Sequence, residues 1–227
     1  MIISSRICII VLTALLAAGL VGCGDDSDDS VKPGPSRYKD LTQKDHTLLN
    51  LEIACNDRNV VEYDRLLDDD FIFHFGLWDY NMGYVGVEWW DRAAEITVTA
   101  KMFDPSYSHP RVDPISSIDM SFYYQAGDTA WVEIAPRDTL QFPGEKWYKK
   151  NVRYDLLAKA GSMNYTALLI PMDVVIRSTS SQGKTVWRIV DLYDDTIQSS
   201  SVSENDLSDF SVPEDFTLGR LKWLFVE

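Results

Sequence analysis

The repeat of apolar residues along this chain is helical at first and strand-like later. After residue 40, apolar side chains recur three, four or seven positions apart, which is the spacing that keeps them on one side of a helix. These residues are Leu41, Leu48, Leu51 and Cys55. Thr42, with Asp45 three residues later, is typical of a capping box, so the sequence predicts that a helix begins here.

A second, shorter helix is predicted directly after the first. Asn59 is a favoured N-cap residue, and the apolar face that follows is Tyr63, Leu66 and Leu67. Three consecutive aspartates at 68–70 are interpreted as a solvated turn. They lead into a strand at 71–75, where three phenylalanines share one face and His74 lies on the other.

A third helix is predicted over residues 87–103, after a loop rich in glycine and aromatic residues. Its apolar residues step by four, three, four and three positions, as on one face of a helix. They are Trp89, Ala93, Ile96, Ala100 and Phe103.

Beyond that helix, apolar and polar residues alternate, which is the pattern of half-buried strands. Strands are predicted near residues 118–124, 130–134, 146–158, 165–177 and 186–193, with turns at Gly161 and Gln182-Gly183. Helices followed by a run of hairpin-linked strands predict an α+β fold, with three N-terminal helices on one face of an antiparallel sheet.

Residues 1–22 are predicted to be an export signal, because Arg6 precedes an apolar run that is shorter than the ~20 residues needed to span a bilayer. The run ends in Leu20-Val21-Gly22-Cys23, which resembles the bacterial lipoprotein signal. The resemblance implies that Cys23 is acylated, palmitate included, becomes the mature N-terminus and anchors the protein to the cell membrane or outer membrane. An ordinary secretory signal and an uncleaved membrane anchor are the alternatives.

Residues 23–39 are acidic and then rich in proline and glycine, which predicts a flexible tether. A globular domain is predicted at 40–198, and a polar linker with a short helix at 199–227. Once Cys8 leaves with the signal and Cys23 is acylated, Cys55 is the remaining thiol, which excludes an intrachain disulfide and a zinc site built from several thiolates. Its place on an apolar helix face predicts a buried, unreactive thiol.

Composition and charge narrow the function further. Of 227 residues, 35 are acidic and 21 are Lys or Arg, and the formal net charge is −14. A nucleic-acid partner is therefore not expected, because such a partner needs a basic surface. Hydrophobic residues make up 45% of the chain, so it can bury a core of its own.

The order of predicted elements resembles the nuclear transport factor 2-like superfamily, which includes SnoaL-like and ketosteroid-isomerase-like proteins. Residues 66–73, LLDDDFIF, are similar to its passage from the second helix into the first strand, and 186–192, VWRIVDL, to its closing strand. The resemblance spans about residues 40–198. It implies a cone-shaped, cystatin-like curved sheet around an apolar cavity. Enzymes of the superfamily place an Asp, His or Tyr in this cavity, and other members are non-catalytic binding or assembly modules.

Proton abstraction next to a carbonyl needs a base poised by burial and a donor for the developing oxyanion. His74 is the leading candidate, and Asp70 and Asp191 are weaker ones. The structural alternatives are a histidine at a strand end, a solvated turn for Asp70, and an ion pair of Asp191 with Arg188 or Arg153. No catalytic motif of the superfamily transfers onto these positions. The sequence has no phosphate loop or zinc motif, so no cofactor and no metal site is predicted.

Aromatic residues gather before the third predicted helix. Trp78, Tyr80, Tyr84 and Trp89 could line the mouth of the cone for a flat apolar or carbohydrate ligand, or fill its open end. Near the C-terminus, Ser211 to Glu214 is typical of a capping box before a short helix, which docks either on its own domain or on a partner.

The sequence thus predicts a lipid-anchored protein of the cell envelope with a non-catalytic ligand-binding or assembly domain. A small-molecule isomerase or dehydratase, with its acid–base residue inside the cone, is the alternative. Expected partners are the membrane through Cys23, a small apolar ligand, and a second copy or another envelope protein.

Overall fold

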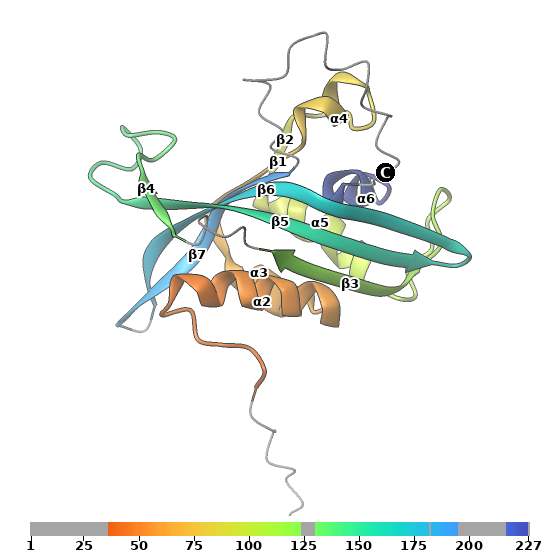
Figure 1. The fold of residues 1–227 in the computed structure, drawn as a ribbon, viewed down its shortest axis with the longest axis horizontal. Helices are drawn as coiled ribbons and strands as arrows, with labels where there is room; N and C mark the ends of the chain where they lie inside the picture. The colour runs from red at the N-terminus through yellow and green to blue at the C-terminus, as the bar shows by residue number, and fades with distance from the viewer. Residues whose placement is uncertain (1–35, 124–129, 182, 195–216, 227) are drawn as a thin grey trace, which may run out of the picture. The chain divides into compact units, whose positions relative to one another are not determined.

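The alternating segments form strands, and all of them join one twisted, unclosed sheet (Figure 1). A computed structural model describes residues 36–123, 130–181, 183–194 and 217–226. The predicted leader, Cys23, most of the tether and the capping box at 211–214 lie outside the described residues. From Arg37 onward, the described chain belongs to one compact unit.

The sheet has the order β2-β1-β7-β6-β5-β3, and β4 pairs with the same strand as β3, namely β5. The strands are β1 (Leu67–His74), β2 (Trp89–Asp91), β3 (Ile115–Tyr123), β4 (Val132–Ile134), β5 (Trp147–Ala160), β6 (Met163–Ser181) and β7 (Lys184–Asp194). All neighbours are antiparallel except β1 and β7, which run parallel. The predicted sheet was purely antiparallel. The difference arises because the first strand of the chain, β1, lies next to the last, β7, which a hairpin pattern does not reveal.

The first two predicted helices are confirmed as α2 (Lys44–Asp57) and α3 (Val60–Leu66), but the predicted capping box is wrong. Helix α2 begins after Gln43, which makes no side-chain cap, and the Thr42 hydroxyl donates to Asp40 at 2.8 Å instead. The N-cap of α3 is confirmed, since the Asn59 side chain accepts from the backbone N–H of Glu62 at 3.1 Å. In the described part of the chain, no helix is both long and apolar enough to cross a bilayer.

The third predicted helix is shorter than expected and presents a different face. Helix α5 is Arg92–Phe103, with Asp91 as its N-cap, and residues 89–91 form β2 instead. A short helix that the sequence did not predict, α4 (Leu77–Asn81), precedes it. The buried residues of α5 are Glu95, Val98, Thr99, Met102 and Phe103, so of the predicted stripe only Phe103 is buried. The buried face thus includes the carboxylate of Glu95, which a pattern of apolar residues does not predict.

The sheet has two differently covered faces. The inner face packs against α2, α3, α5 and the C-terminal helix α6 (Leu218–Trp223), and it carries residues such as Phe73, Tyr154 and Val174. On the opposite, outer face, a small second cluster consists of Phe142, Trp147, Val175 and Val190. Figure 1 shows α2 along β3 and the long β5–β6 hairpin crossing the molecule.

Helix α6 is fixed to the inner side of the fold by buried polar groups. The backbone N–H of Leu218 donates to the Tyr154 hydroxyl at 2.8 Å, and that of Gly219 donates to Asp194 Oδ2 at 2.5 Å. The Thr217 hydroxyl and the Arg220 guanidinium both bind Asp79, which is fully buried. The free N–H groups at the start of the helix are thereby satisfied by the body of the domain.

We expect Gly219→Ala to destabilise the protein. A Cβ at this position would lie 2.8 Å from Phe75 Cδ1 and 3.0 Å from Asp194 Oδ2. In an unobstructed helix this change stabilises by about 1 kcal/mol. Here, overpacking should lower the free energy of unfolding by about 1–3 kcal/mol, measured by urea denaturation. Thr97→Ala, on the exposed face of α5, is the control without a clash. A stabilised Gly219→Ala variant would contradict the docking of α6.

Candidate functional site

The interior of the fold, between the helices and the sheet, contains a charged group that the chain itself neutralises. Glu95 is fully buried, and its carboxylate accepts hydrogen bonds from the Tyr63 hydroxyl, the Thr99 hydroxyl at 3.3 Å and the Trp90 indole N–H at 2.8 Å. The Lys222 ammonium, from α6, forms an ion pair with it and also donates to the Tyr63 hydroxyl at 3.1 Å. Lys222 is only 1% exposed.

Aromatic rings complete the enclosure of this ammonium group. The Lys222 nitrogen lies 4.2 Å from the centroid of the Phe73 ring, a cation–π distance. Burial, together with the neighbouring Glu95 charge, raises the pKa of Tyr63 well above its usual value. Burial also raises the pKa of the Cys55 thiol, to about 12. The Tyr63 hydroxyl and the Cys55 thiol therefore stay protonated at neutral pH.

The structure places His74 on the outer face of the sheet. Its ring stacks on Tyr193 with a centroid separation of 4.0 Å, and its Nε2 lies 3.1 Å from Asp191 Oδ1. The phenylalanines at 71, 73 and 75 point to the inner face, as predicted, so the alternation of β1 is what directs His74 to the other side. His74 therefore does not face the interior between the helices and the sheet.

Asp191 owes its position to an irregularity in β7. Val175 pairs with Asp191 and Ile176 pairs with Ile189, so Val190 is an extra residue between them. Such a bulge re-aims the neighbouring side chains. The Asp191 side chain is 2% exposed, and its Oδ1 also accepts a 2.7 Å charge-assisted bond from Arg137 Nη1.

The three aspartates at 68–70 lie within β1, not in a solvated turn. Between the pairs Leu67↔Ile189 and Ile72↔Asp191, the backbone of β1 has more residues than β7, so this segment bulges out of the ladder. Asp68 is buried and pairs with Arg177 at 2.6 Å, and Asp70 pairs with the same guanidinium at 2.8 Å. Glu145 contributes a third, longer contact to Arg177 at 3.3 Å.

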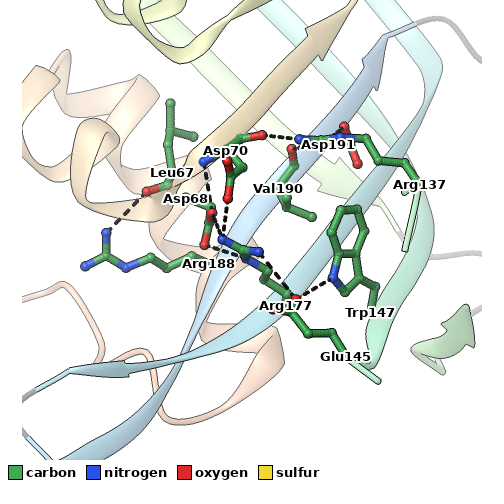
Figure 2. A network of polar contacts seen from close by, with 10 residues as sticks. All are labelled: Leu67, Asp68, Asp70, Arg137, Glu145, Trp147, Arg177, Arg188, Val190 and Asp191. Carbon is green, nitrogen blue, oxygen red and sulfur yellow. Dashed lines mark hydrogen bonds and ion pairs between the residues drawn. The ribbon is translucent and has the colours of Figure 1, made fainter. Parts of the chain in front are cut away.

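Figure 2 shows how this network joins Asp70 and Asp191. Arg137 donates to the backbone carbonyl of Asp70 at 2.5 Å and to that of Val190 at 3.3 Å, besides its bond to Asp191. The structure therefore brings His74, Asp70 and Asp191 together through shared partners. The partner of Asp191 is Arg137, whereas the sequence suggested Arg188 or Arg153.

An open pocket of about 290 Å³ lies beside this network on the outer face. We call it the outer pocket. Its lining comes from the end of β4 and the segment after it, and from β5, β6 and β7. It consists of Ile134, Ala135, Arg137, Trp147, Lys149, Asp173, Val175, Asp191 and Tyr193. Lys149 and Asp173 form an ion pair across it at 3.1 Å. Burial raises the pKa of Tyr193 to about 12, so its hydroxyl remains protonated at neutral pH.

The predicted aromatic ligand-binding residues lie elsewhere. Trp78, Tyr80, Tyr84 and Trp89 are 36–55% exposed and line neither the outer pocket nor the interior cluster. The Arg220 guanidinium stacks on Tyr84 at 4.0 Å, which ties this segment to α6. Trp90, one residue further on, is the aromatic residue that fills the interior.

Sequence reasoning missed most of the residues that build these sites. Arg137, Lys149 and Asp173 share no motif in the sequence. The pairing of β5 with β6 brings Lys149 beside Asp173, and the segment between β4 and β5 carries Arg137 to Asp191. Glu95 could have been placed in the first turn of a helix from the sequence, because Asp91 is a favoured N-cap residue, but its burial could not. No group of three or more potential metal ligands occurs within the residues that the structure describes.

Comparison with known proteins gives structural similarity alone. The sequence matches no protein-family model and no curated protein. One similar structure is a nuclear transport factor 2-like protein of unknown function in nutrient uptake from Rhodospirillum rubrum, at 14% identity and a TM-score of 0.43, covering 67% of this chain and 97% of that one.

Two further structures are similar to a comparable degree. A proposed aromatic ring hydroxylase from Novosphingobium aromaticivorans is 9% identical with a TM-score of 0.46, covering 71% of this chain and 91% of that one. A proposed dehydratase of the nuclear transport factor 2-like family from Streptomyces avermitilis is 10% identical with a TM-score of 0.42, covering 68% and 93%. At these values the similarities carry no argument about what this chain does.

We expect Lys222→Met to be strongly destabilising, because it leaves Glu95 as an unpaired charge in the interior. Removing one partner of a buried pair costs about 3–5 kcal/mol, and the loss should be visible in the free energy of unfolding from urea denaturation. The double variant Lys222→Met/Glu95→Leu should regain most of this loss, since neither charge remains. Lys159→Met, on an exposed lysine, is the matched control. A cost below about 1 kcal/mol for the single variant would show that the pair does not hold α6.

Proposed function

We propose that this chain is a lipid-anchored protein of the cell envelope whose domain binds or assembles without catalysing a reaction. The observation that carries the proposal is the insertion of Lys222 into the interior, where an enzyme with this fold would need an accessible acid–base group. Here the interior carboxylate is already neutralised by the chain's own ammonium group. We also propose that the domain is a cone of the nuclear transport factor 2-like type. Its element order supports this, with α2, α3, β1 and α5 preceding the long meander.

The alternative, an isomerase or dehydratase, finds less support in the geometry. Proton abstraction requires a base that substrate can reach. His74, the leading candidate, is on the outer face, and Asp191 is shared between His74 and Arg137. The interior phenol of Tyr63 has a raised pKa and already donates to Glu95. None of these groups is an available base at the bottom of a closed cavity.

The reactivity of Cys55 tests whether the interior is closed. Cys55 is 3% exposed and the pKa of its thiol is about 12, so little thiolate forms and a reagent has no access to it. We expect a thiol-specific reagent to label almost none of the mature, acylated chains at pH 8 under native conditions. In denaturant it should add one label per chain. Val61→Cys, which places a thiol on a 73%-exposed position, should label at once under native conditions. Rapid native labelling of Cys55 would point to an open interior and favour the enzyme.

Anchoring at Cys23 has a direct test that does not depend on the interior. Intact-mass measurement of the protein purified from membranes should give a chain that begins at Cys23 and carries the mass of its acyl chains, since stable anchoring needs more than one lipid chain. Cys23→Ser should remove this mass, whereas Cys55→Ala should retain it. A native N-terminus at any other residue, or one without lipid, would overturn the anchor.

A further inference from the structure

The outer pocket has a floor, a wall and hydrogen-bonding groups that come from four separate segments. Val175 and Trp147 belong to the second hydrophobic cluster and form an apolar floor. The segment between β4 and β5 is held over this face by Phe142, which is 5% exposed and packs on Trp147 at 5.1 Å, and by Arg137. The pocket is thus built by side chains that the rest of the fold keeps in place.

Two polar groups of the pocket have unused hydrogen-bonding capacity. Asp191 Oδ1 is shared by His74 and Arg137, but no described residue donates to Oδ2, although the side chain is 2% exposed and lines the pocket. The Tyr193 hydroxyl likewise makes no hydrogen bond with the described residues, and it lines the same pocket. Neither oxygen is among the fully buried side-chain atoms that lack a partner, so water reaches both, and a ligand hydroxyl can take the place of that water.

Charge restricts what that ligand can be. The two cations of the pocket, Arg137 and Lys149, are balanced by Asp173 and Asp191. A ligand ammonium at Asp191 Oδ2 would lie close to the Arg137 guanidinium, which already neutralises that carboxylate. A ligand anion at Lys149 would meet Asp173, which is 3.1 Å from the same nitrogen. A neutral hydroxyl avoids both repulsions, because it can donate to a carboxylate and accept from an ammonium.

We propose that the outer pocket binds a small neutral polyol, namely a single sugar ring. One ring hydroxyl donates to Asp191 Oδ2, and others exchange hydrogen bonds with the Tyr193 hydroxyl and the spare N–H groups of Lys149. The C–H face of the ring lies on the apolar floor at Val175. The volume, about 290 Å³, is just below the ~300–1,000 Å³ range of ligand pockets, which suits one ring and not a larger molecule.

This inference rests on the binding role of the proposed function and names its ligand class. It concerns the outer face, so it is independent of the interior and of the anchor. The aromatic residues at 78–89 have no part in it.

The test is a ligand-observed NMR titration of the full chain, purified in detergent, with a panel of single compounds. Glucose, galactose, mannose and N-acetylglucosamine are the sugar probes, glycine and betaine the zwitterionic probes, and acetate and phosphate the anionic probes. We expect saturable binding of at least one sugar and none of the zwitterions or anions. Saturable binding of a zwitterion or an anion with no sugar bound would overturn the neutral-polyol assignment, and no binding by any sugar would do the same.

Variants locate the binding. Tyr193→Phe removes one hydroxyl and should raise the dissociation constant roughly threefold to tenfold, the range expected for one hydrogen bond. Lys149→Met should raise the dissociation constant by a similar factor. Tyr80→Phe, which removes a hydroxyl outside the pocket, should leave it unchanged. Native chemical-shift dispersion of each variant shows that it is folded. Sugar binding that both pocket variants leave intact would place the site elsewhere and overturn the proposal.

The outcomes separate this inference from the proposed function. If no sugar binds but the intact mass shows acylated Cys23 and Cys55 resists labelling, the ligand class is wrong and the anchored, closed domain stands. If Cys55 labels rapidly while a sugar binds with the expected variant effects, the outer pocket stands and the closed interior fails.

Discussion

The contact between Lys222 and Glu95 is the interaction on which the arrangement of this domain depends. It joins the last helix to α5, and through the Tyr63 hydroxyl it also reaches α3. Two charges in an interior are unfavourable unless they are paired and fully hydrogen-bonded. Here Trp90 and Thr99 supply the remaining donors to the carboxylate. The pair therefore favours one position for α6, because a shift of that helix would separate two opposite charges inside the domain.

The polar side chains of the outer pocket lie on the other face of the sheet, away from this pair. Lys222 and the apolar core fill the interior. The side chains of β5, β6 and β7 that point to the outer face are therefore the ones that a ligand can reach. Two irregularities concentrate them there, the extra residue Val190 in β7 and the bulging aspartates of β1. Arg137 and Arg177 stabilise the bulge of β1 by hydrogen bonds and ion pairs with Asp68 and Asp70.

Much of the fold could be predicted from the sequence, because period and capping are local properties. The strand through Phe71, the N-cap at Asn59 and the long hairpins all follow from neighbouring residues, although the strand begins at Leu67 and not after the three aspartates. The face of α5 could not be predicted in the same way, since Glu95 points inward only because Lys222, 127 residues later in the chain, neutralises it. The parallel pairing of β1 with β7 is equally non-local.

The candidate site shows the same division between local and distant information. Strand alternation already separated His74 from the phenylalanines, but it could not say which face the helices cover, and the burial of the phenylalanines decides that. Charged residues that form the outer pocket carry no mutual signal in the sequence, since Lys149, Asp173 and Asp191 meet only through strand register. A carboxylate with one oxygen engaged and the other open, on a face with balanced charges, is a feature of the assembled sheet. It favours recognition by hydrogen bonds over attraction of an ion, and for an acidic protein this means that net charge says little about the ligand.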